Sequence, residues 1–256
     1  MIAANLALRE LFHLVFLRDL ARSVKPSSFV LKGGANLRFF FGSPRYSEDM
    51  DIDAREIPVF LLQDKVMGIL TSTALLDTLR TFGVVQVVPP RLASAKQTET
   101  VQRFKVHLKT SANEDLATKV EFSRRGFDEP VQSEPIPPPF LSVYRMPPLV
   151  VPHYGAAAAA RQKVEAILGR RRTEARDIFD LFILSPRLST ESLATAFTKA
   201  ELVSARERVF SVEYEQFRDT VVSFLASEDQ TTYDSKELWD EVRLRAVHLL
   251  DVGEAK

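Results

Sequence analysis

Residues Phe29–Asp53 read FVLKGGANLRFFFGSPRYSEDMDID, and this stretch decides the fold. The pattern predicts a short apolar strand, a glycine pair, a short helix, and a second strand with an acidic residue at every second position. Because successive side chains of a strand point to opposite faces, Asp49, Asp51 and Asp53 share one face, and the apolar residues between them share the other. The segment therefore predicts a strand with one face in the core and one face that presents carboxylates to a cation.

The spacing of the three aspartates decides which of them can share a metal. At a rise of about 3.3 Å per residue, Asp49 and Asp51 lie roughly 6.6 Å apart at their backbones, and Asp53 lies roughly 13 Å from Asp49. Carboxylate oxygens are the ligands that Mg²⁺ prefers. We therefore expect Asp49 and Asp51 to hold the metal, Asp53 to be a strand-end residue, and a third carboxylate to come from a neighbouring strand.

Gly33 and Gly34 lie between the first strand and the following helix. Without a Cβ they allow close approach of a polyphosphate, and the free N–H groups of the helix favour negative charge. An isolated glycine pair more often makes only a tight turn. Neither the P-loop pattern nor the dinucleotide-binding pattern is present in the chain. The acidic strand downstream is what favours the phosphate-binding interpretation.

These residues also carry a family resemblance. KGG-x-x-L-R followed by R-Y-S-E-D-M-D-I resembles the signature of the AbiEii-type nucleotidyltransferase toxins (AbiEii, AbiGii and MenT), a branch of the polymerase-β-like superfamily. The resemblance implies that Asp49 and Asp51 are catalytic and hold Mg²⁺, and that Gly33 and Gly34 contact the triphosphate of an NTP.

Two further motif positions precede the acidic strand, Arg45 and Ser47. We expect both on the same strand face as the aspartates and in contact with the nucleotide. Arg45 could equally be a salt-bridge partner that holds the acidic loop.

Thr118–Ser123 reads TKVEFS and alternates as a strand does. It resembles the second acidic strand of the family, which makes Glu121 the candidate third metal ligand. The alternative for a single glutamate in a strand is simple exposure to solvent. We expect residues 103–109 and 118–123 to pair as a hairpin beside the aspartate strand, which would bring Glu121 level with Asp49 and Asp51.

Two later helices resemble family motifs. KVEAILGR (163–170) matches K-x-x-A-x-x-x-R, and RDIFDL (176–181) matches R-D-x-x-D-L. The resemblance implies catalytic roles for Lys163 and Asp177 and nucleotide binding by Arg170 and Arg176. Lys163 and Arg170 are two turns apart and would project from one helix face.

Each of these residues has a structural alternative. Arg176 and Asp180 would form an ordinary i,i+4 surface ion pair. Asp177 could cap or bridge a neighbouring helix. The short spacing between the motifs leaves open which of Arg170, Arg171 and Arg172 contacts phosphate, and three consecutive arginines are more often a solvated face.

Composition sets further bounds on the class of protein. The 256 residues include no cysteine and carry a formal net charge of zero, which suits a cytoplasmic protein and makes no general case for nucleic acid. The apolar N-terminal stretch is interrupted by charges, so we expect an amphipathic helix against the core and no membrane association. The four histidines lack metal-ligand spacing. Positive charge gathers locally over residues 161–176, where the acceptor stem of a tRNA could bind through its phosphates.

The predicted fold class is α+β. It comprises a polymerase-β-like nucleotidyltransferase lobe over residues 1–150, with a mixed sheet and flanking helices, and an all-helical lobe over 151–256. The proline-rich segment 128–152 predicts an extended connector. Expected helices in the first lobe are 1–24, 35–41 and 58–82, and expected strands are 29–32, 48–54, 84–88, 103–109 and 118–123. Expected helices after the connector are 154–170, 173–184, 190–200, 204–226 and 235–251.

The resemblance implies a toxin of a toxin–antitoxin, abortive-infection type system for phage defence, with a companion antitoxin encoded nearby. It would be a Mg²⁺-dependent enzyme that adds nucleotides from an NTP (a pyrimidine nucleotide or GTP) to the 3′ acceptor end of tRNA and so blocks translation. Two alternatives remain: a nucleotidyltransferase that acts on a small-molecule or protein hydroxyl, and a non-catalytic NTP-binding regulator.

Overall fold

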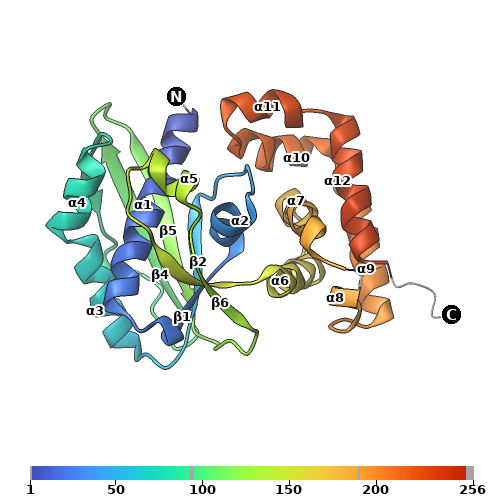
Figure 1. Cartoon of the computed structure of the whole chain (residues 1–256), viewed down its shortest axis with the longest axis horizontal. Helices are drawn as coiled ribbons and strands as arrows, with labels where there is room; N and C mark the ends of the chain where they lie inside the picture. Colours follow the sequence, from blue (N-terminus) through green and yellow to red (C-terminus); the bar gives the residue numbers. More distant parts are fainter. Residues whose placement is uncertain (1, 93–94, 190, 252–256) are drawn as a thin grey trace. The chain divides into compact units, whose positions relative to one another are not determined.

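The computed structural model describes residues 2–92, 95–189 and 191–251 (Figure 1). The chain divides into two compact units. The first unit comprises Met1–Phe40 and Tyr46–Tyr154, and the second comprises Phe41–Arg45 and Gly155–Lys256. The first residues of the expected helices 1–24 and 190–200 lie outside the described residues.

The first unit is built on a seven-stranded mixed sheet with the strand order β3-β4-β5-β2-β1-β7-β6. The strands are β1 (Phe29–Lys32), β2 (Asp49–Ala54), β3 (Val84–Val88), β4 (Val101–Thr110), β5 (Asp115–Ser123), β6 (Val131–Pro135) and β7 (Val150–Tyr154). Strand β2 is antiparallel to β1 and parallel to β5, and β1 is parallel to β7. This mixed sheet with flanking helices confirms the predicted α+β class.

The predicted hairpin beside the aspartate strand is present. Strands β4 and β5 pair antiparallel over nine residue pairs, so each is longer than the pattern predicted. In the parallel pairing of β2 with β5, Asp51 lies opposite Glu121 and Asp49 lies opposite Lys119. The two predicted acidic strands are therefore neighbours, as expected.

Four helices precede β3 in the chain: α1 (Ile2–Ser23), α2 (Gly33–Phe41), α3 (Val59–Leu70) and α4 (Thr73–Arg80). Helix α1 is buried without interruption from Glu10 to Leu17, so it is more enclosed than a one-faced amphipathic helix. The expected single helix 58–82 is wrong. Ser72 accepts a hydrogen bond from the Leu75 N–H and caps a new helix, with a bend of 41° between α3 and α4.

Among the described helices, none is by itself long and apolar enough to cross a membrane, although the bent pair α3–α4 passes that test by length and composition.

The expectation of an extended connector over residues 128–152 is also wrong. This segment forms β6, helix α5 (Pro138–Val143) and β7, all in the first unit. The prolines are tolerated because Pro135 ends an edge strand and Pro138 begins α5, where the missing N–H has no helical partner in any case. Apart from Phe41–Arg45, the second unit begins only after Tyr154.

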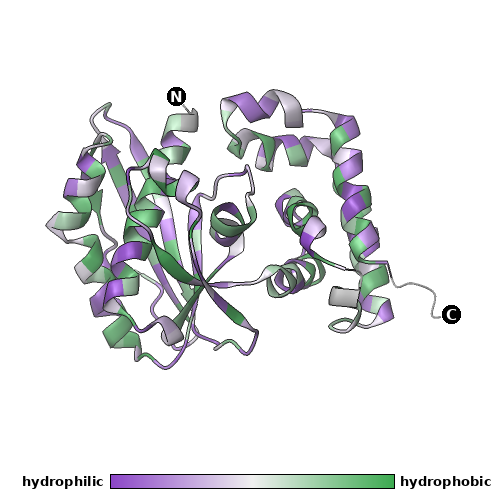
Figure 2. Ribbon diagram, in the orientation of Figure 1, coloured by the Kyte–Doolittle hydropathy of each residue, from purple (hydrophilic) through white to green (hydrophobic). Residues whose placement is uncertain are grey.

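The described part of the second unit contains helices and no strand. The helices are α6 (Ala156–Gly169), α7 (Ala175–Leu184), α8 (Glu191–Ala194), α9 (Lys199–Phe210), α10 (Tyr214–Thr220), α11 (Ser227–Tyr233) and α12 (Lys236–Leu249). The expected long helices 190–200 and 204–226 are broken, because a capping box at Thr198 starts α9 and α9 ends at Ser211. Phe217 stacks on Trp239 in the core of this unit, with ring centroids 4.6 Å apart. Figure 2 shows apolar and hydrophilic residues interspersed along α12, as expected for a helix that covers a core with one side.

Candidate active site

Gly33 begins helix α2 directly behind the aspartate strand. Its φ of +67° is in the left-handed region, and a Cβ at this position would lie 2.9 Å from Oδ2 of Asp51. Only glycine fits both conditions without strain. Helix α2 therefore begins at the glycine pair, two residues earlier than predicted, with the backbone of Gly33 against the carboxylate of Asp51 and Gly34 as its second residue.

The three predicted metal ligands lie on two adjacent strands. Asp51 is opposite Glu121 in the β2–β5 register, and Asp49 is two residues before Asp51 on the same strand face. All three side chains are partly buried, in contrast to the solvent-exposed alternative for Glu121. The structure thus brings together the carboxylates that the sequence predicted.

Asp51 is the most perturbed of the three. Burial raises its pKa above the ordinary value, and the positive charges of Lys32 and Lys119 offset only part of this effect. The neighbouring carboxylates of Glu121 and Asp49 raise the pKa further. A bound cation would therefore stabilise the ionised form of Asp51, because it would offset both the burial and the two neighbouring carboxylates.

Two cations that the sequence analysis missed neutralise the flanking carboxylates. Nζ of Lys119 lies 3.0 Å from Asp49 Oδ2 and 3.8 Å from Glu121 Oε2. Nε of Arg103 donates a hydrogen bond of 2.6 Å to Glu121 Oε2. Both cations could have been predicted, because the alternation of the hairpin places them on the same face as Glu121.

The residues present fit a divalent cation by their chemistry. Hard carboxylate oxygens come from two adjacent strands. Because Gly33 has no Cβ, no side-chain atom of that residue lies against the carboxylate of Asp51. As the described side chains stand, no group of three or more His, Asp or Glu residues has the spacing to hold a metal ion. Asp49 and Glu121 are instead directed to Lys119 and Arg103.

Asp53, the expected strand-end residue, is buried. One carboxylate oxygen lies 2.5 Å from Nζ of Lys32, and the other accepts a hydrogen bond of 2.7 Å from the hydroxyl of Tyr154. Burial and the bond to Asp53 raise the pKa of Tyr154. Asp53 on β2 therefore contacts Lys32 on β1 through an ion pair and Tyr154 on β7 through a hydrogen bond. These contacts connect the three strands.

Ser47 and Arg45 do not lie on the face of the aspartate strand, because β2 begins only at Asp49. The hydroxyl of Ser47 donates a hydrogen bond of 2.7 Å to the backbone carbonyl of Asp49. Arg45 is buried in the second unit, and its guanidinium lies 3.3 Å from Asp180 Oδ1. The contact with Asp180 corresponds to the salt-bridge alternative for Arg45, and this partner lies on helix α7.

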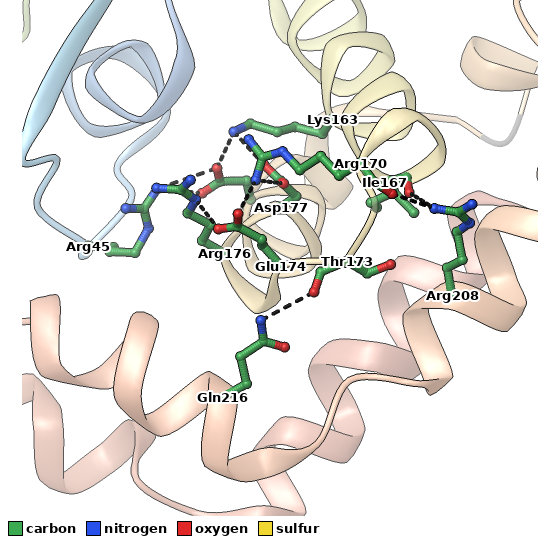
Figure 3. A network of polar contacts seen from close by, with 11 residues as sticks. Arg45, Lys163, Ile167, Arg170, Thr173, Glu174, Arg176, Asp177, Arg208 and Gln216 are labelled. Carbon is green, nitrogen blue, oxygen red and sulfur yellow. Dashed lines mark hydrogen bonds and ion pairs between the residues drawn. The ribbon is translucent and has the colours of Figure 1, made fainter.

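A charged network in the second unit contains the later motif residues (Figure 3). Nζ of Lys163 lies 2.6 Å from Asp180 Oδ2 and 3.2 Å from Asp177 Oδ1. Both carboxylates are almost fully buried. Asp177 therefore bridges helices α6 and α7, which was one of its predicted alternatives.

Electrostatics hold this buried network in its charged form. Burial alone would lower the pKa of Lys163, but the charges of Asp180 and Asp177 outweigh it and raise the pKa. Burial would raise the pKa of Asp180, but Lys163 and Arg45 outweigh it and lower the pKa. Each group is charged because its partners are.

The arginines of the same network lie at its edge. Arg170 Nη1 is 2.8 Å from Asp177 Oδ2 and 3.1 Å from Glu174 Oε1. Helix α6 ends at Gly169 and Arg170 has an extended backbone, so Arg170 does not share a helix face with Lys163 as predicted, although both contact Asp177. Arg176 pairs with Glu174 at 2.9 Å, and the expected Arg176–Asp180 surface pair is absent because Asp180 is buried on Lys163. Lys163, Arg170 and Arg176 of the positive cluster over 161–176 are therefore paired with carboxylates within their own unit.

Comparisons with known proteins agree with this arrangement. The family model described as "Nucleotidyl transferase AbiEii toxin, Type IV TA system" matches residues 15–241. No curated protein matches the chain. Similar solved structures include MenT4, a nucleotidyltransferase toxin from Mycobacterium tuberculosis H37Rv, at 19% identity and a TM-score of 0.59 over 99% of this chain and 87% of that chain.

Two Helicobacter pylori structures are similar as well. A putative nucleotidyltransferase is 21% identical with a TM-score of 0.55, over 94% of this chain and 91% of that chain. JHP933 is 20% identical with a TM-score of 0.53, over 93% and 87% respectively. At these identities the likeness shows a shared fold. Because the family model covers most of the chain, this protein belongs to the AbiEii nucleotidyltransferase toxin family of type IV toxin–antitoxin systems.

Proposed function

We propose that this protein is a Mg²⁺-dependent enzyme that transfers nucleotides from an NTP to the 3′ acceptor end of tRNA and so blocks translation. The observation that carries the proposal is the parallel β2–β5 register, which places Asp51 opposite Glu121, with the backbone of Gly33 against Asp51. In the reaction, the acceptor hydroxyl oxygen bonds to the α-phosphorus, the bond from the α-phosphorus to the bridging oxygen breaks, and pyrophosphate leaves.

Asp49, Asp51 and Glu121 would hold Mg²⁺. When bound, the metal supplies charge neutralisation of the triphosphate and acidifies the acceptor hydroxyl. The N-terminal N–H groups of α2 at Gly33 and Gly34 would orient the triphosphate by hydrogen bonding. When the carboxylates of Asp49 and Glu121 bind Mg²⁺, Lys119 and Arg103 would be released from them and would bind the phosphates of the substrate.

The residues of the second unit divide by exposure. Arg170 and Arg176 are partly exposed, and their pairing with Glu174 leaves the remaining guanidinium nitrogens able to bind phosphate. Asp177 is buried and Lys163 is largely so; in this proposal Asp177 holds Arg170 in place by charge, and Lys163 in turn holds Asp177. The roles of Arg45 and Ser47 would likewise be indirect, through Asp180 and the backbone of β2.

The biological setting is proposed from the family. The companion of this toxin would be an antitoxin encoded alongside it, and the setting would be the cytoplasm of a cell that defends itself against phage by abortive infection. A pyrimidine nucleotide or GTP is the proposed NTP.

The test is incubation of the purified protein with total tRNA and each labelled NTP, with and without Mg²⁺. We expect Mg²⁺-dependent label on tRNA that is lost in Asp51→Asn. Label on a small molecule or on protein, with none on tRNA, would replace the tRNA proposal with the alternative acceptors. Saturable NTP binding with no transfer to any acceptor would support a non-catalytic regulator.

A further inference from the structure

The outer face of the β4–β5 hairpin is basic. On β4, Phe104, Val106 and Leu108 point into the core, so the alternate residues face outward. These outward residues are Arg103, Lys105, His107 and Lys109. The same face of β5 carries Lys119 beside Glu121. The hairpin therefore extends from the proposed metal site as a surface of repeated positive charge.

This surface is hollowed. A cavity of about 480 Å³ lies along β4 and the segment after β3, and its lining includes the cations Arg91, Lys96, Arg103 and Lys105 together with His107. None of its lining residues is a carboxylate. A second hollow of about 440 Å³ shares Lys105 and His107 with the first and is also lined by Lys119 and by the carboxylates of Glu48 and Asp49. We call the two hollows together the basic groove; its cations are Arg91, Lys96, Arg103, Lys105 and Lys119, and it reaches Asp49.

Two lysines of the groove have no acidic partner among the described residues, Lys96 and Lys105. Lys105 also lies directly opposite Lys119 across the β4–β5 pair. Like charges directly opposite each other destabilise a sheet. By contrast, His107 and Lys109 share the carboxylate of Asp115, at 2.9 Å and 2.6 Å. The lysines without an acidic partner, Lys96 and Lys105, thus both line the larger cavity of the groove.

We propose that the basic groove binds the backbone phosphates of the acceptor RNA strand as its 3′ end approaches Asp49 and Asp51. The outward residues of β4 repeat roughly every 6.8 Å, which gives a row of cations for a polyanion. Among the described lining residues the only aromatic ring is the imidazole of His107, so recognition acts mainly through charge and is largely independent of sequence. This inference rests on the proposed function, and it places the acceptor on β4 and not on the cluster 161–176, in which Lys163, Arg170 and Arg176 are already paired with carboxylates.

The test measures RNA binding by itself. A labelled single-stranded RNA oligonucleotide is titrated with the full-length protein by fluorescence anisotropy over a range of salt concentrations. The variant is Lys96→Ala/Lys105→Ala, which breaks no described ion pair. The matched control is Lys25→Ala/Lys65→Ala, which removes two exposed lysines outside the groove.

We expect the groove variant to bind RNA at least about tenfold more weakly, and its slope of log affinity against log salt to fall by about 1.4, because each phosphate contact on a single strand contributes about 0.7. The control variant should bind as the wild type does. Equal binding by the groove variant and wild type, or no salt-dependent RNA binding by wild type, would overturn the inference.

Two further measurements separate this inference from the proposed function. Binding of a labelled NTP should be unchanged in Lys96→Ala/Lys105→Ala, and a loss confined to NTP binding overturns the RNA assignment. Groove-dependent RNA binding without nucleotide transfer would support the groove and refute the proposed function. Transfer by the groove variant with wild-type KM for RNA would refute the groove and leave the proposed function intact.

Discussion

Asp51 and Glu121 face each other across the parallel strands β2 and β5, although seventy positions separate them in the chain. Their meeting depends on register, because a slip of one residue would turn either side chain to the opposite face of the sheet. The register is held from the core side by Met50, Ile52 and Val120, which are fully buried. The packing of the apolar face thus determines which carboxylates meet on the polar face.

Asp51→Asn should abolish nucleotide transfer without lowering stability. Removal of a direct ligand should reduce activity by at least about 100-fold, the upper range for weaker second-shell changes at metal sites. The pKa of Asp51 is raised in the folded state, so its contribution to stability declines as pH rises from the unfolded value through the folded one. At pH 7 the neutral amide avoids that penalty, and the melting temperature should be unchanged or higher.

The measurements are transfer of labelled NTP and thermal unfolding at pH 7. Asp64→Asn, an exposed carboxylate on α3, is the matched control and should retain both properties. Full transfer activity in Asp51→Asn would contradict the assignment of the acidic site.

Gly33→Ala should damage the site by moving Asp51. The left-handed backbone costs a non-glycine residue about 1–2 kcal/mol, and the added Cβ would also press on Oδ2 of Asp51. A displacement of this kind should lower the transfer rate by about 100-fold. Gly126 also has a positive φ, +81°, but a Cβ added there would meet no atom within 4 Å.

Gly126→Ala therefore serves as the control for the backbone effect. It should lose similar stability in chemical denaturation and retain transfer activity. If both variants are equally active, the close approach of Gly33 to Asp51 has no catalytic importance.

Lys163→Met should destabilise the protein more than it affects substrate binding. It removes one cation from two buried carboxylates, and broken buried pairs cost about 3–5 kcal/mol. Because Arg45 and Arg170 still contact Asp180 and Asp177, the loss should be near the lower value. Chemical denaturation would measure the loss, and Lys163→Met/Asp180→Asn should recover part of it.

A direct role of Lys163 in phosphate binding gives a different result. In that case, Lys163→Met would weaken NTP binding strongly under conditions where the variant remains fully folded, and Asp180→Asn would not restore binding. NTP titration of the folded variants decides between the two roles.

The face on which each carboxylate lies could be predicted from the sequence, because alternation within β2 and β5 is a local signal. The choice of Glu121 as the partner of Asp51 came from the family resemblance, since no local signal connects residues on strands so far apart in the chain. The same rule of alternation identifies Lys105 and Lys119 as outward cations on the neighbouring positions.

Local caps at Ser72 and Thr198 explain the wrong helix boundaries, whereas other wrong predictions concern long-range contacts. Arg45 binds Asp180, which is 135 positions away, and no local period indicates that partner. The proline-rich segment joined the sheet because β7 finds β1 as a parallel neighbour, an effect of tertiary structure that overrides the composition of the segment. The same holds for Asp180, whose i,i+4 relation to Arg176 was less favourable than a buried contact with Lys163.

His13 should make the protein sensitive to acid. It lies on α1 and is almost completely buried. Burial, together with the charge of Arg9, lowers the pKa of His13 from 6.5 to about 3. Its Nε2 donates to the hydroxyl of Thr118 at 2.8 Å, because that hydroxyl's own proton is donated to the Glu48 carbonyl. Since the folded pKa is depressed, the stability contribution is complete above pH 6.5 and is lost as pH falls toward 3, by about 5 kcal/mol in total.

The free energy of unfolding measured between pH 7 and pH 3 checks this prediction. His13→Gln keeps a donor for Thr118 but cannot be protonated, so its stability should decline less over this range than that of the wild type. His248→Gln, which changes an exposed histidine, should decline in parallel with the wild type. Because Thr118 also holds the carbonyl of Glu48, immediately before β2, protonation of His13 should loosen the start of the aspartate strand first. Parallel pH profiles for His13→Gln and the wild type would show that this histidine does not determine acid stability.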